Sequence, residues 1–224
     1  GNIRAYGISR FNWNLGHRGR KLGRRPRRGI HRRDPRWLQS AKHATYAVPV
    51  LLGLALLMLL SAFLGDEFSI RYVAEHSSRT LPLYLKISAV WAGQQGSLLL
   101  WAWFQGLFAA LAVGIPSKKA HPLVPWATVF LNGITAFFSV VMVVLSNPFV
   151  MLPETPPNGL GLNPLLRHPG MIFHPPTLYV GYVGLAVPFA FALAALVTRR
   201  IKGWTQAVHP WTLVAWLGLG LGLL

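Results

Sequence analysis

The stretch that decides the fold is NPLLRHPGMIFHPPTLYVGYVGLAVPFAFALAA, residues 163 to 195. It begins with a polar segment broken by prolines, which carries His168 and His174, and then continues without a charged side chain from Phe173 to Val197. An uncharged run of this length can cross a bilayer as a helix. We therefore expect the two histidines just before the start of an apolar helix, close to a membrane surface.

The composition of the whole chain is that of a membrane protein. Of its 224 residues, 53% are hydrophobic and only 12% are charged, with a mean hydropathy of +0.41, whereas soluble domains have about 25% charged residues. The absence of cysteine excludes a disulfide framework, a thiolate metal site and a cysteine nucleophile. We predict an all-α fold, a polytopic transmembrane helical bundle with two long extracytoplasmic loops.

Apolar runs of spanning length recur along the chain, and tryptophans lie near several of their ends, as is typical of membrane interfaces. The expected spans are residues 46–64, 97–115, 123–145, 177–197 and 210–224. The last run is short for a crossing, so we expect the sequence to stop inside a fifth span.

Positive charge is concentrated in residues 1–45, which hold 13 of the 22 Lys and Arg residues and one acid, Asp34. Clustered Arg and Lys can bind RNA or anionic lipid, but such a segment beside a first span also fixes membrane topology. We interpret residues 1–45 as a basic cytoplasmic arm next to membrane lipid, with no nucleic-acid partner. Residues 46–224 form the transmembrane part.

The charge of the loops predicts the orientation in a bacterial inner membrane. The short basic loops at 116–122 and 198–203 should stay in the cytoplasm together with the arm. The long loops at 65–96 and 146–176 alternate with them and should face outside. This arrangement places three histidines on the outer side, namely His76, His168 and His174.

Few side chains remain for chemistry. The chain has only five acids, with none inside an expected span, which argues against an ion-coupled transporter, and we assign no catalytic residue. Histidine can ligate a metal or haem iron, and the pair Pro175-Pro176 would hold His174 in one direction. The alternatives are a helix-capping or loop-bonding role for His174 and an exposed loop position for His168.

The segment WAGQQGSLLLWAW, residues 91–103, is also dense in unusual residues. Tryptophan and glycine together at a membrane rim can form a flat surface for a large aromatic ligand such as a porphyrin. Trp91 and Trp101 would contribute to such a surface. The alternative is an ordinary belt of interfacial aromatic residues.

Several of these blocks resemble the cytochrome c maturation protein F (CcmF) family. The blocks are LPLYLKISAVWAGQQGSLLLW at 81–101, SNPF at 146–149, LNPLLRHPGMIFHPPTLYVGYVGLAVPFAFA at 162–192 and HPWTLVAWLGLGLG at 209–222. The resemblance covers about residues 46–224, and HPPxLYxGYVG is its most specific part. CcmF is a membrane haem lyase of the haem-handling protein superfamily, and this chain corresponds to its N-terminal part.

The resemblance implies cytochrome c-type biogenesis. A haem chaperone would supply haem, which is then joined to the CxxCH motif of apocytochrome c at the outer face of the inner membrane. It implies a haem contact or axial ligand role for His174, with His168, Trp91 and Trp101 as further candidates for cofactor binding. It also implies b-type haem as well as haem in transit, and an apocytochrome-binding membrane subunit as a partner.

Two departures from the family pattern stand out. Gln95 occupies a position where the family usually has Glu, and residues 1–33 are Arg-rich where the family has an apolar first span. We treat an atypical or out-of-frame origin of residues 1–33 as a hypothesis. The alternative function, from another class, is a non-enzymatic haem or small-molecule permease subunit.

Overall fold

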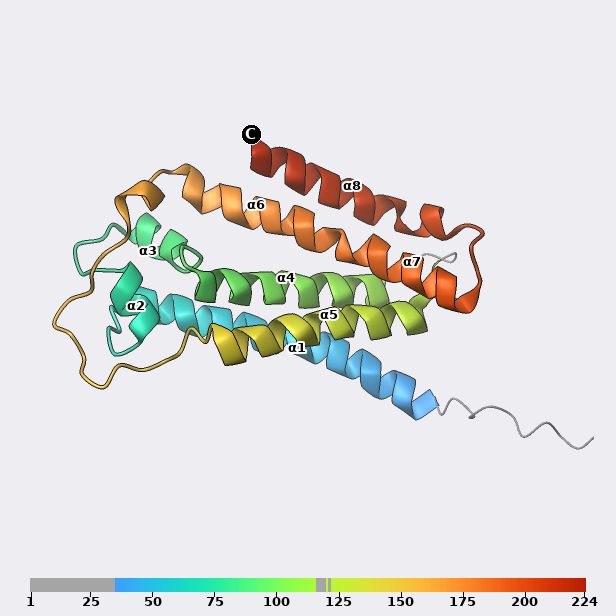
Figure 1. Ribbon diagram of the computed structural model, residues 1–224, viewed down its shortest axis with the longest axis horizontal. Helices are drawn as coiled ribbons and strands as arrows, with labels where there is room; N and C mark the ends of the chain where they lie inside the picture. Colours follow the sequence, from blue (N-terminus) through green and yellow to red (C-terminus); the bar gives the residue numbers. More distant parts are fainter. Residues whose placement is uncertain (1–34, 116–119, 121) are drawn as a thin grey trace, which may run out of the picture. The chain divides into compact units, whose positions relative to one another are not determined.

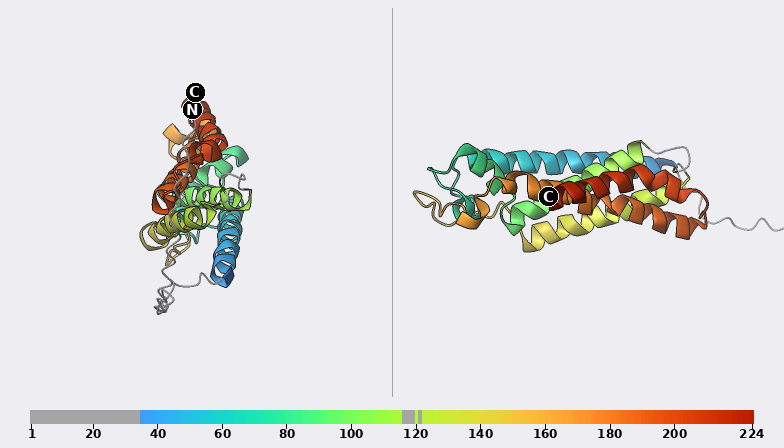
Figure 2. Two further views of the ribbon diagram at one scale, coloured as in Figure 1. Left: turned by 90° about the vertical axis from the view of Figure 1, so that its right-hand side faces the viewer. Right: turned by 90° about the horizontal axis from the view of Figure 1, so that it is seen from above.

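The long helices of the protein run back and forth beside one another (Figures 1 and 2). The structure is a computed structural model that describes residues 35–115, 120 and 122–224. In chain order the helices are α1 (Pro35–Leu64), α2 (Arg71–His76), α3 (Leu83–Ala89), α4 (Gln94–Gly114), α5 (Val124–Leu145), the 3-10 helix η1 (Pro164–Leu166), α6 (Gly170–Gly184), α7 (Ala186–Thr198) and α8 (Trp204–Leu223).

The predicted all-α class is confirmed. Within the described ranges, strand-like pairing is limited to one bridge between Ile70 and Met151. Residues 1–34 of the predicted basic arm lie outside the described residues, whereas its last part, 35–45, is the beginning of α1. α4 is the central helix, because it contacts α1, α5, α6 and α7.

Helices long and apolar enough to cross a membrane lie at Gln39–Leu64, Gln94–Gly114, Val124–Leu145 and Gly170–Thr198; these are the four found among the described residues. α8 covers the run expected at 210–224 but begins earlier, at Trp204, and its first half is more polar. Two expected loops also change. Residues 65–96 contain α2 and α3, and the helix expected at 177 begins at Gly170.

Prolines explain where the fourth long helix is interrupted. α6 and α7 form nearly one helix with a break at Leu185. Pro188 has no N–H to donate to the carbonyl of Gly184, four residues earlier, so the regular hydrogen-bond ladder cannot continue there. Leu185 N still donates to Gly181 O at 3.3 Å, which keeps the two parts close to coaxial.

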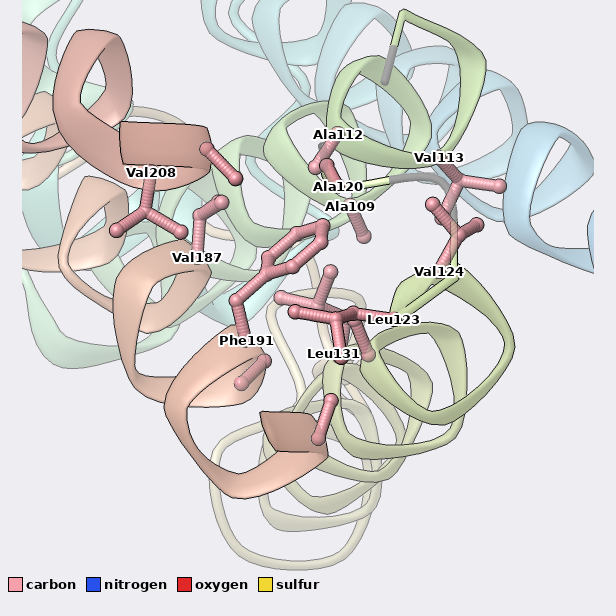
Figure 3. Close-up of a cluster of buried hydrophobic side chains, with 14 of the residues drawn as sticks. Ala109, Ala112, Val113, Ala120, Leu123, Val124, Leu131, Val187, Phe191 and Val208 are labelled. Carbon is pink, nitrogen blue, oxygen red and sulfur yellow. The ribbon is translucent and has the colours of Figure 1, made fainter. Parts of the chain in front are cut away.

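Small residues let the helices approach closely. Lipid is as apolar as the side chains, so helix association in a membrane depends on tight packing more than on the hydrophobic effect. In the cluster of Figure 3, Phe191 of α7 is 2% exposed and points toward Ala109 and Ala112 of α4. The alanines leave room for the ring, and Leu131 of α5 lies beside it.

The contact between α6 and α8 is tighter still because glycines face each other. A β-carbon on Gly181 would lie 2.5 Å from Leu219 Cγ and 2.6 Å from the backbone nitrogen of Leu219. A β-carbon on Gly218 would lie 2.8 Å from the Gly181 nitrogen. Backbone atoms cannot move aside as a flexible side chain can, so this crossing requires glycine at both positions.

We predict that Gly181→Ala destabilises the protein by about 1–3 kcal/mol, the usual cost of overpacking. The matched control is Gly220→Ala, because a β-carbon on Gly220 meets nothing within 4 Å. Thermal unfolding in detergent would compare them. Equal melting temperatures for the two variants would contradict the proposed close approach of α6 and α8.

Candidate functional site

Residues 65–93 and 146–169 pack together at one end of the bundle, and we call this region the cap (Figure 1, left). The two segments are joined by backbone hydrogen bonds from Arg71 N to Val150 O (2.9 Å), Leu152 N to Ser69 O (2.7 Å), Leu160 N to Ala74 O (2.7 Å) and Gly161 N to Ser77 O (2.9 Å). Among the described residues one ion pair is present, between Lys86 Nζ and Asp66 Oδ1 at 2.6 Å, and Lys86 is only 8% exposed. The cap is therefore a folded structure rather than a pair of independent loops.

Tyr72 joins α2 to the turn that precedes α4. Its hydroxyl accepts the N–H of Gly93 at 2.9 Å and donates toward the carbonyls of Ala89 and Val90 at 3.3 and 3.2 Å. Burial raises the pKa of the Tyr72 hydroxyl above its ordinary value, so the group keeps its proton and its donor role. A β-carbon on Gly96 would lie 1.7 Å from Val90 O, so this turn has no room for a side chain there.

The same packing covers the glycine surface that the sequence suggested as a porphyrin platform. A β-carbon on Gly93 would lie 2.7 Å from His76 Nε2 and 2.8 Å from Tyr72 Cε2. His76 also bonds through Nδ1 to Tyr72 O at 3.0 Å. Of the three outer histidines, His76 is thus a packing residue of the cap.

Trp91 forms the hydrogen bond that links the two motifs singled out in the sequence. Its indole Nε1 donates to Met171 O at 2.8 Å. In a regular helix that carbonyl would accept the N–H of residue 175, but residue 175 is proline and has none. The indole therefore replaces the missing donor and ties the start of α6 to the turn before α4.

His174 lies inside α6, one turn after its start, and not in a loop before the helix as the sequence predicted. The helix continues through Pro175 and Pro176 because Trp91 satisfies the freed Met171 carbonyl. The hydroxyl of Thr177 donates to the carbonyls of Phe173 and His174 at 2.7 and 3.0 Å, which further supports this turn. The His174 imidazole is exposed and makes no hydrogen bond to the part of the chain that the structure describes.

His168 has the capping role that the sequence left open for His174. Its Nδ1 accepts the backbone N–H of Gly170 at 3.1 Å, at the beginning of α6. A neutral imidazole that accepts at Nδ1 carries its proton on Nε2. His168 therefore offers no free lone pair for a metal while this bond persists, whereas His174 has both ring nitrogens available.

Trp91 and Trp101 do not share one surface. Trp101 lies deeper in α4, with its ring centroid 5.4 Å from those of Phe138 and Tyr179 and 6.4 Å from that of Tyr182. Trp103 faces the other way, because a β-carbon on Gly53 of α1 would lie 2.9 Å from its Nε1. The aromatic partners from α5 and α6 could not be identified from the sequence, since their spacing along the chain does not indicate which helices meet.

The described residues contain no group of three or more His, Cys, Asp or Glu side chains that could hold a metal ion. A single exposed imidazole fits a different requirement. Haem iron already has four porphyrin nitrogens and takes one or two ligands from protein. The cap can therefore offer one axial ligand, His174, in a turn with defined backbone hydrogen bonds.

Apolar helices of spanning length, closed at one end by a folded polar cap, define an integral polytopic helical membrane protein. The chain belongs to the cytochrome C assembly protein family, whose sequence profile matches residues 91–224. This finding, together with the relatives below, confirms the resemblance to CcmF.

The relatives agree with each other. "Cytochrome c-type biogenesis protein CcmF" of Pseudomonas aeruginosa is 45% identical over 198 residues, which are 87% of this chain and 30% of that protein. The protein of the same name from Escherichia coli is 37% identical over 198 residues, again 87% and 30%. A solved structure, "Cytochrome c Heme Lyase CcmF", matches with a TM-score of 0.71 and 34% identity, over 84% of this chain and 30% of that one. The chain thus spans about 30% of the length of these relatives.

We predict that Trp91→Phe loosens the start of α6. The ring is kept but the N–H is lost, which leaves Met171 O without its donor at a cost of about 1–1.5 kcal/mol. Hydrogen exchange of the peptide covering residues 170–178 should become about tenfold faster.

Trp103→Phe is the matched control, because Trp103 faces α1. It should leave exchange of the same peptide unchanged. If Trp91→Phe also left the exchange unchanged, the indole would not be the donor that replaces residue 175.

Proposed function

We propose that this chain is the N-terminal part of a membrane haem lyase of cytochrome c biogenesis in the bacterial inner membrane. The whole protein would receive haem from a haem chaperone and promote its attachment to the CxxCH motif of apocytochrome c. The names of the relatives support the general role. The observation that carries the proposal is the exposed, unbonded imidazole of His174 on a turn held by Trp91.

The distribution of charge supports an outward-facing cap. Arg199, Arg200 and Lys202 lie in the turn between α7 and α8, at the end of the bundle opposite the cap (Figure 1). Short basic connections stay in the cytoplasm. The cap, including His168 and His174, would then face the outer side, where apocytochrome c receives its haem.

His174 would act as a ligand to haem iron from the cap. Bound haem supplies two vinyl groups, and each thioether forms when a cysteine S–H adds across one of them, with no leaving group. The chain has no cysteine, so both thiols come from apocytochrome c. The task of this chain is to hold the haem at the bilayer surface in one orientation while the thiols approach.

The further candidates would act around this contact. Trp91 positions His174 through Met171 O, and His168 keeps the start of α6 in place through Gly170. Trp101, with Tyr179 and Tyr182, forms an aromatic group deeper in the helices that could line an apolar side of the bound macrocycle. An apocytochrome-binding membrane subunit would present the apocytochrome to the cap.

We predict that His174→Ala in the full-length protein weakens binding of externally supplied haem by about tenfold or more, because one iron–nitrogen bond is lost. Titration followed by absorption spectroscopy would measure the affinity. The intrinsic b-type haem that the family resemblance implies should remain.

His168→Asn is the matched control, because asparagine can still accept the Gly170 N–H at the helix start. It should bind haem nearly as the wild type does. Equal haem affinity for His174→Ala and the wild type would remove His174 from the site. Haem binding by the wild type without any attachment to apocytochrome c in the complete system would favour the permease alternative.

A further inference from the structure

The Arg167 guanidinium is a fixed positive charge on the cap, three residues before α6. Its Nε donates to the carbonyl of Leu162 at 2.9 Å, and Leu162 is 1% exposed. Its terminal nitrogens make no hydrogen bond to a described residue, and the ion pair of the described residues lies elsewhere, at Lys86 and Asp66. Arg167 is thus held at one side and free to bind an anion with the other.

Hydroxyl groups converge with this charge at Gly161. The place that a β-carbon on Gly161 would occupy lies 3.7 Å from Arg167 Nη2 and 3.7 Å from Ser78 Oγ. Gly161 has a positive φ of 85°, which favours glycine, and its N–H is bonded to Ser77 O. Thr80 Oγ1 lies 3.4 Å from Ser78 Oγ.

One carboxylate can reach both groups at this position. The two donors lie equally far from the same point, and no side chain fills the space between them. A guanidinium binds carboxylate with charge-assisted hydrogen bonds, and a serine hydroxyl can donate to the second oxygen. The arrangement is a cation and a hydroxyl held in place by backbone contacts, as a specific anion site requires.

We propose that Arg167 and Ser78 form a carboxylate subsite that binds a haem propionate, an inference that rests on the proposed haem contact at His174. The short segment 167–174 connects Arg167 directly to the turn that carries His174. Both propionates lie on one edge of haem, away from the vinyl groups. Holding the propionate edge against the cap leaves the vinyl edge toward the approaching thiols, so the subsite would determine the orientation of the substrate.

The test compares haem with its dimethyl ester, which keeps the iron and the vinyl groups but has no carboxylate. Binding is titrated in the full-length protein for the wild type, Arg167→Gln, Ser78→Ala and His174→Ala. Ser78→Ala leaves the bond between Arg167 and Leu162 intact, so it tests the subsite even if Arg167→Gln disturbs the cap. Arg79→Gln is the control, because Arg79 is an exposed cap arginine that bonds Pro157 O and lies 5.9 Å over the Phe68 ring.

We expect the wild type to bind haem about tenfold more tightly than the ester, the effect of a charge-assisted hydrogen bond. Arg167→Gln should remove this preference, Ser78→Ala should reduce it, and Arg79→Gln should keep it. His174→Ala should weaken binding of both ligands.

Different failures are distinguishable. If His174→Ala weakens both ligands but Arg167→Gln keeps the full preference for haem, the subsite is wrong and the haem contact stands. Equal losses of haem and ester in Arg167→Gln and Ser78→Ala would also overturn the subsite, since the effect would not depend on a carboxylate. If the wild type binds neither ligand, the proposed function fails together with the subsite.

Discussion

The hydrogen bond from Trp91 Nε1 to Met171 O is the interaction on which the arrangement of the cap depends. A proline inside a helix leaves the carbonyl four residues earlier without a donor, and such a group is costly near the hydrocarbon region. At Pro175 the indole supplies the donor, so the helix extends to Gly170 and includes His174. One side chain thus joins the turn before α4 to the helix that carries the candidate ligand.

Close packing around this bond leaves little freedom for the residues concerned. Gly93 and Gly96 bring the turn against His76, Tyr72 and the Val90 carbonyl, while Gly181 and Gly218 bring α6 against α8. Both ends of the Trp91 contact are therefore fixed by separate backbone approaches. The outcome is a rigid frame with a few exposed polar groups, which is the kind of setting that holds a ligand in one orientation.

Hydropathy and loop composition were enough to predict the helical class and the approximate spans, because uncharged runs of this length have few other solutions. The start of α6 was wrong, because the pair Pro175-Pro176 was interpreted as the end of a loop. Only tertiary contact with Trp91 makes a helix possible there. Spacing alone could not separate His168 from His174, since the difference is a single bond to Gly170 N.

The central claim is that Trp91 holds the turn from which His174 contacts haem at the cap. A cryo-EM structure of the full-length protein with added haem would test it most directly. The account predicts an iron atom bound by the His174 imidazole, with the Trp91 indole still on Met171 O. Haem bound away from the cap, or an iron ligated there by another residue while His174 points away, would contradict it.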